Sequence, residues 1–108
     1  MTMTTKELKD KYKNEFDRVQ KLINDFDPCG LIQSGAPYDE YDCLTNHLVG
    51  MTIKGTTIEE LKTLITTEMT DHFGVEIPTA EPYKSKFQKD LHEFAISVRQ
   101  FDKYTDNA

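Results

Sequence analysis

The sequence predicts an all-α fold, a single-domain compact bundle of about four helices over residues 1–108. Apolar side chains recur every three or four residues in four separate stretches, the spacing that places them on one face of a helix. Two of these stretches begin with Thr-x-x-Glu, the capping-box pattern of a helix N-terminus. A chain of 108 residues with 37% hydrophobic and 30% charged residues can bury one core and is globular rather than disordered.

The first helix is predicted from Thr4 to Phe26, with Thr4 and Glu7 as its capping box. Its continuous apolar stripe consists of Leu8, Tyr12, Phe16, Val19, Leu22 or Ile23, and Phe26. Asp27-Pro28 ends the helix, because a residue before proline is pushed out of the helical region.

Residues 27–38 are predicted to form a structured loop, punctuated by Pro28, Gly30, Gly35 and Pro37. Leu31 and Ile32 should pin this loop to the core. A second helix is expected from near Asp39 to Lys54, with Gly55 as its stop. Its apolar stripe is Tyr41, Leu44, Leu48 and Met51. Gly50 lies inside it and weakens the last turn by roughly 1 kcal/mol relative to alanine.

A third helix follows the capping box of Thr57 and Glu60 and should close at 72–74. Its stripe is Ile58, Leu61, Ile65 and Met69. Residues 75–78 form a short extended linker, and a fourth helix is expected to begin near Glu81-Pro82. Its stripe is Tyr83, Phe87, Leu91, Phe94, Val98 and Phe101, before a polar tail at 102–108 that we expect to fray.

The net charge of −6 is concentrated in the middle of the chain. Residues 27–81 contain ten acidic and two basic residues, a balance of −8, whereas residues 1–26 and 82–108 are each +1. Such acidity repels nucleic acid and anionic membranes, so neither is an expected partner. It suits a basic protein partner, although acidity also serves solubility alone.

Several features predict a cytoplasmic protein. Charged residues follow the first few positions at once, without the apolar stretch of a secretory signal. No apolar run is long enough to span a bilayer. The two cysteines, Cys29 and Cys43, do not form a disulfide framework and should remain thiols.

The densest group of chemically active side chains is Asp39-Glu40-Tyr41-Asp42, predicted in the first turn of the second helix. Acids are stabilised at a helix N-terminus by the unpaired N–H groups and the helix dipole. That accounts for one or two of the three carboxylates. Capping explains a third carboxylate less well, because crowded like charges repel. The group therefore predicts an acidic surface that faces a basic partner. Tyr41 fits the apolar stripe and should be in the core, whereas Tyr38 should be exposed and suited to recognition.

Metal and catalytic sites are weakly indicated. Cys43 and His47 share a helical face, with Cys29, Asp39 or Asp42 as conceivable further ligands. No second close pair of ligands accompanies them, as a structural zinc site requires. No nucleophile signature, Glu-x-x-His pair or phosphate loop is present. We therefore predict no metal, no cofactor and no catalytic residue.

The stretches Ile23-Asn24-Asp25-Phe26-Asp27-Pro28 and Gly35-Ala36-Pro37-Tyr38-Asp39-Glu40-Tyr41-Asp42 resemble the YugE-like family of small bacterial proteins. The segments Gly55–Leu61 and Phe73-Gly74 also fit, so the likeness covers roughly residues 5–75. The resemblance implies an all-helical fold and an unestablished function. Family members tend to have a glutamate where this chain has Leu44, and some relatives look like immunity proteins.

The leading hypothesis is a small acidic protein-binding module, in its sharpest form an immunity protein that neutralises a basic toxin. Its predicted partner-binding residues are Asp27, Tyr38, Asp39, Glu40 and Asp42. One alternative is a metal-binding domain or small enzyme that uses the region of Asp27, Asp39 and Asp42, with His47. The other is a structural domain that forms homo-oligomers. The sequence leaves the oligomeric state open.

Overall fold

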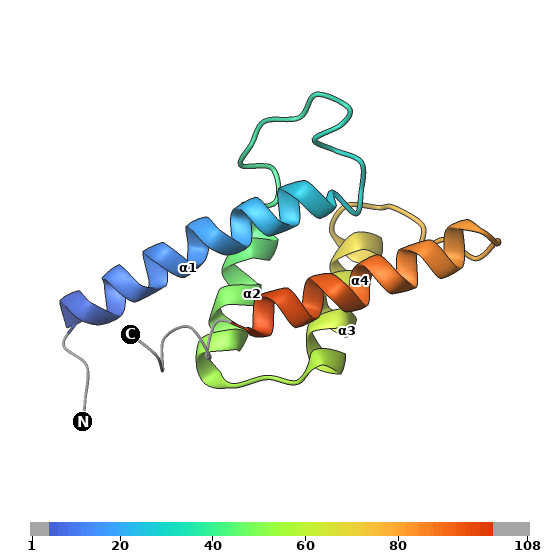
Figure 1. Ribbon diagram of the computed structural model, residues 1–108. Coiled ribbons are helices and arrows are strands. Elements are labelled where there is room, and N and C mark those ends of the chain that lie inside the picture. The colour runs from blue at the N-terminus through green and yellow to red at the C-terminus, as the bar shows by residue number, and fades with distance from the viewer. Residues whose placement is uncertain (1–4, 101–108) are drawn as a thin grey trace.

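The computed structural model describes residues 5–100, with side chains from Asp10 onward. It contains α1 (Thr5–Phe26), α2 (Asp42–Lys54), α3 (Ile58–Asp71) and α4 (Tyr83–Arg99), and no strand within that part of the chain (Figure 1). The predicted all-α fold with four helices is confirmed. The expected capping box at Thr4 and Glu7, the apolar position Phe101 and the tail at 102–108 lie outside the described residues or side chains.

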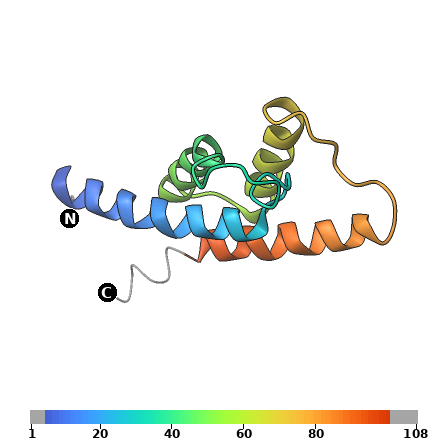
Figure 2. The ribbon, with the colours of Figure 1, turned by 90° about the horizontal axis from the view of Figure 1, so that it is seen from above.

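The four helices form two layers. Helices α1 and α4 lie side by side and run in opposite directions, while α2 and α3 lie together on one side of them (Figure 2). Helix α2 contacts α1, and α3 contacts α4, so each helix of one layer rests on a helix of the other. Both connections between the layers, residues 27–41 and 72–82, are long, whereas the α2–α3 connection is short.

The core lies between these layers and draws on all four predicted stripes. Ile23 of α1, Leu48 of α2, Ile65 of α3 and Val98 of α4 are fully buried. The ring of Phe26 packs against α4, with its centroid 5.2 Å from that of Phe94. Tyr83 departs from its predicted place in the stripe, because it is 69% exposed. Helix α4 begins only at Tyr83, where its first turn projects from the bundle (Figure 1).

Helix α2 begins later than predicted. Before it, the amide N–H of Glu40 donates to the carbonyl of Pro37 and that of Asp42 to the carbonyl of Asp39, so residues 37–42 form two tight turns. The first turn of the helix therefore contains Asp42 but neither Asp39 nor Glu40. The prediction of three carboxylates in that turn is wrong, and Tyr41 at the N-cap provides no side-chain cap.

Helix α3 begins as predicted. The Thr57 hydroxyl accepts from the Glu60 amide N–H at 3.1 Å, and the Glu60 carboxylate accepts from the Thr57 amide N–H at 3.1 Å. The reciprocal capping box is confirmed, and α3 ends at His72 as its C-cap. The predicted linker at 75–78 contains neither helix nor strand.

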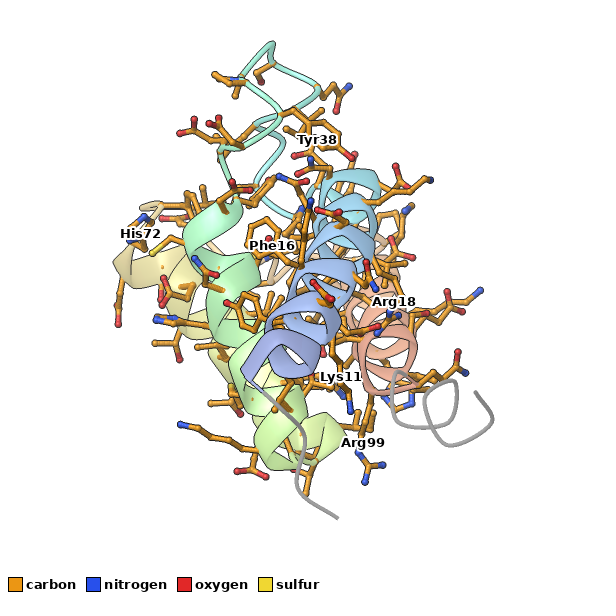
Figure 3. All side chains as sticks on the ribbon, turned by 90° about the vertical axis from the view of Figure 1, so that its left-hand side faces the viewer. Lys11, Phe16, Arg18, Tyr38, His72 and Arg99 are labelled. Carbon is orange, nitrogen blue, oxygen red and sulfur yellow. The ribbon has the colours of Figure 1, made fainter. Side chains whose placement is uncertain are left out.

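Arg18 connects α1 to the end of α4 and was not predicted from the sequence. Its guanidinium forms a salt bridge with Glu15 at 2.9 Å and donates to the carbonyls of Ser97 and Val98, both at 2.8 Å. Figure 3 shows Arg18 on the side of α1 that faces α4. These carbonyls belong to the last turn of α4, where a cation is favourable to the helix dipole.

Candidate partner-binding loop

The loop between α1 and α2, residues 27–41, projects from one end of the bundle (Figure 1). Asp27 starts it with a φ of 48°, in the left-handed region that aspartate tolerates better than most residues. Its carboxylate accepts hydrogen bonds from the amides of Ile32 at 3.1 Å and Gln33 at 3.0 Å. One side chain thus folds the first half of the loop back on itself.

Tyr41 attaches this folded loop to the core. Its side chain is fully buried, and its ring packs edge-on against Phe73 with centroids 5.4 Å apart. Its hydroxyl donates to Asp27 Oδ1 at 2.7 Å and accepts from the amide N–H of Cys29 at 3.0 Å. The predicted core position of Tyr41 is confirmed, and Leu31 and Ile32 pack against the core as predicted.

The hydrogen-bond network changes the acidity of its members. Burial alone would raise the pKa of Asp27, but hydrogen bonds from Tyr41 and from backbone N–H groups outweigh it, so this pKa lies below its usual value of 3.8. Burial and the hydrogen bond to Asp27 raise the pKa of Tyr41. Burial is also the main cause that raises the pKa of Cys29 to about 11. At neutral pH Asp27 is therefore ionised, while Tyr41 and Cys29 keep their protons.

The outer edge of the loop, residues 38–40, has exposed side chains, in contrast to the hydrogen-bonded Asp27 and the buried Tyr41. Tyr38 is 58% exposed, which confirms its predicted place on the surface (Figure 3). Asp39 and Glu40 are exposed, and their side chains have no ionic or hydrogen-bonding partner among the described residues. Beneath them, buried Asn24 donates from Nδ2 to the Tyr38 carbonyl at 2.8 Å. The backbone under this edge is therefore held while its side chains are free.

The five predicted partner-binding residues fall into two groups. Tyr38, Asp39 and Glu40 form the free outer edge. Asp27 and Asp42 are engaged inside the molecule: Asp27 with the loop backbone and Tyr41, Asp42 through a 2.7 Å hydrogen bond from Gln20 Nε2. Sequence reasoning missed Asn24 and Gln20. The signal for Asn24 was a polar residue next to Ile23 on the buried side of α1.

The residues of the alternative metal or catalytic hypothesis are not assembled into a ligand set. Among the described residues, no group of three histidine, cysteine or acidic side chains could hold a metal ion. His47 lies instead 3.3 Å from Glu68 of α3, and His72 lies 3.8 Å from the other oxygen of the same carboxylate. Cys29 and Cys43 are both free thiols.

None of the described helices has the length and apolar character needed to cross a membrane. Comparison of the chain with protein-family models, with curated proteins and with solved structures finds no match.

Proposed function

We propose that this protein is a protein-binding module whose recognition surface is the outer edge of the 27–41 loop. The observation that carries the proposal is the combination of a 58% exposed tyrosine and two carboxylates that have no partner among residues 10–100, on a backbone held by Asn24. Without a partner, the exposed Tyr38 ring leaves apolar surface in contact with water. To a partner protein it offers a rigid contact area and a hydroxyl group.

The rest of the loop supports this assignment by limiting the entropy lost on binding. A loop that is ordered before it meets its partner loses less conformational freedom than a mobile one. Asp27, Tyr41 and Asn24 order this loop through hydrogen bonds of 2.7–3.1 Å. In this proposal Asp27 positions the surface, whereas Tyr38, Asp39 and Glu40 contact the partner.

The proposed partner is a basic protein, because Asp39 and Glu40 have no cationic partner in the described part of the chain and belong to the segment with a balance of −8. Complementary charge speeds association more than it tightens the complex. In the sharpest form of the proposal the partner is a basic toxin that is neutralised by occlusion. We further propose that the chain belongs to the YugE-like family, which its Asp-Pro and Asp-Glu-Tyr-Asp stretches resemble.

A tagged pull-down from the native host, read by mass spectrometry, tests the proposal. The test variant is D39N/E40Q, which removes two charges and leaves the Gln20–Asp42 hydrogen bond in place. The matched control is D17N/E93Q, which removes two exposed acids that belong to α1 and α4 rather than to the loop. We expect one basic partner with wild type and control, and its loss or marked depletion with the test variant.

Binding kinetics then show whether each variant changes the association or the dissociation step. D39N/E40Q should slow association with the captured partner and flatten its dependence on salt. Y38A should mainly speed dissociation, because it removes packed contact rather than charge. Binding that is equal for wild type, D39N/E40Q and Y38A would overturn the assignment of this surface.

A further inference from the structure

Gly50 stands apart from the other glycines of the chain. Gly30, Gly35, Gly55 and Gly74 all have φ between 66° and 99°, where a side chain is strained. Gly50 lies inside α2 with no positive φ, and a Cβ added there would meet nothing within 4 Å. Glycine inside a helix is destabilising relative to alanine. Neither its backbone conformation nor its packing against the described residues explains its presence, whereas close approach by another backbone would.

The surface around Gly50 is a groove formed by α2 and α3. One hollow of about 250 Å³ is lined by Gly50 with Met51, Leu64, His47 and other α2 residues. A second, of about 470 Å³, shares Met51 and Leu64 and continues along α3 past Thr63 and Thr67. In Figure 2, α2 and α3 form the outer layer opposite the α1–α4 pair. An apolar floor beside a notch in a helix is suited to a second helix.

The charges along the groove have opposite signs on its two sides. Lys54 lies at the α2 side, exposed and without an ionic partner among the described residues. Glu59 and Glu60 lie at the α3 side. Glu59 is 80% exposed and has a single long contact to Lys62, at 3.5 Å. Lys54 ends α2 and Glu59 lies in the first turn of α3, so both lie at the same end of the helix pair.

We propose that the groove between α2 and α3 binds the same groove of a second copy of this chain, forming a symmetric homodimer. A two-fold axis parallel to the helix pair places α2 of each copy over α3 of the other at the same height. Lys54 of one copy then faces Glu59 of its partner, twice, while the Gly50 notches admit the opposing helices. Isologous interfaces require such self-complementarity. The proposal is independent of the function assigned to the 27–41 loop, which lies outside this groove.

Analytical ultracentrifugation of the full chain over a concentration series tests the dimer. Wild type is expected to shift with concentration from the chain mass of 12.5 kDa to twice that mass. K54E and E59K should each raise the dimer dissociation constant at least tenfold, because each places two like-charged pairs in the interface. K54Q is the matched control for lost charge alone and should have a smaller effect.

Mixing K54E with E59K gives the sharpest result. The mixed dimer contains two restored Glu–Lys pairs, so it should form with near wild-type affinity while each variant alone stays monomeric. The double variant K54E/E59K should likewise recover self-association. Recovery of this kind requires that the two positions face each other across the interface. Circular dichroism and thermal melting of each variant establish that it is folded.

Gly50→Ala separates the interface from the fold. Alanine should raise the melting temperature of the monomer at low concentration and yet weaken the dimer, since its methyl group occupies the notch. A wild type that stays monomeric at all concentrations, or a dimer indifferent to K54E and to Gly50→Ala, would overturn the proposal. D39N/E40Q should dimerise normally, so failure here and failure of the loop assignment are distinguishable.

Discussion

The Asp27 carboxylate organises several backbone groups that would otherwise need separate partners. Its two oxygens accept from the amides of Ile32 and Gln33 and from the Tyr41 hydroxyl. Hydrogen bonds to a charged acceptor are roughly twice as strong as neutral ones. Because the same carboxylate joins the loop to a buried tyrosine, ionisation of one residue is coupled to the order of the whole 27–41 segment.

Replacing Asp27 with asparagine should lower the free energy of unfolding at pH 7 by about 1–3 kcal/mol, since charged hydrogen bonds are lost. The folded-state pKa of Asp27 is depressed, so its stabilisation is present above the unfolded pKa of about 3.9 and is lost as the pH falls through the folded value. The difference between D27N and wild type should therefore shrink below about pH 4.

Urea unfolding at neutral and acidic pH measures this difference. Asp25→Asn is the control, because Asp25 is exposed and pairs only with exposed Lys21 at 3.2 Å among the described contacts. It should change stability little at either pH. A D27N effect of the same size at both values would contradict the role assigned to the ionised carboxylate.

The two thiols should differ in reactivity. Cys43 is exposed, whereas Cys29 is half-buried with a pKa raised to about 11, so it forms little thiolate at pH 8. We expect alkylation of the folded protein to modify Cys43 well before Cys29, as read by peptide mass spectrometry. In denaturant the two rates should converge. Equal rates in the folded protein would contradict the burial of Cys29.

The apolar stripe predicted the separate fates of Tyr38 and Tyr41, because core positions follow helical spacing. It did not distinguish acidic side chains that accept hydrogen bonds within the loop from those that have no partner among the described residues. Asp27 and Asp39 are the same residue type in the same acidic segment, and they differ only in how the loop closes around them. That closure depends on hydrogen bonds across the loop, from Asn24 to the Tyr38 carbonyl and from Tyr41 to Asp27, each between residues 14 positions apart.

At the scale of the helices, Arg18 of α1 donates to the C-terminal carbonyls of α4 from outside that helix. The side chain of Arg99, the last residue of α4, instead donates to the Thr56 carbonyl at 2.7 Å. Arg18 reaches the last-turn carbonyls from α1 while Glu15 holds the other edge of its guanidinium. One planar side chain thus fixes the position of α4 on α1.

Arg18→Leu should lower the free energy of unfolding by about 2–3 kcal/mol. It removes charged hydrogen bonds and takes away the arginine that pairs with the buried Glu15 carboxylate. Arg18→Lys should lose less, since it keeps the charge but not the two-pronged geometry. Hydrogen exchange should accelerate at the C-terminal end of α4 more than in α3. Uniform acceleration in all helices would show instead a merely global loss of stability.

Helix boundaries were predictable where a side chain signals them. Thr57 and Glu60 cap α3 through groups three residues apart, so local sequence is sufficient. The start of α2 was mispredicted because acidic residues favour both helix N-termini and turns. The two turns over residues 37–42 prevailed here, with Pro37 at their start and Tyr41 drawn into the core.

In the molecule as a whole, one core serves four helices and one loop, so unfolding should be a single cooperative transition. Far-ultraviolet circular dichroism reports the helices. Intrinsic fluorescence reports tyrosines, since the chain has no tryptophan, and Tyr41→Phe identifies the contribution of the loop anchor. The urea midpoints from the two signals should coincide. A tyrosine transition at lower urea would indicate that the loop unfolds independently of the bundle.

Four amphipathic stripes were sufficient to predict four helices around one core. They did not predict which helices are neighbours, since a stripe shows which face is buried and not what covers it. The pairing of α1 with α4 depends on two long connections and on the contacts of Arg18 and Phe26, all between segments far apart in the sequence.

The Arg18 contact also bears on the order in which the protein can be made. Its two carbonyl acceptors lie 79 and 80 residues further along the chain. A nascent chain emerges from the ribosome N-terminus first, so α1 is synthesised long before the turn that it holds. Helix α2 can cover part of the apolar face of α1 early, but the part that α4 covers lacks its partner until the end of α4 has left the exit tunnel. Docking of α4 on α1 through this arginine is accordingly a late step in the folding of the bundle, and it follows the synthesis of nearly all of the described helices.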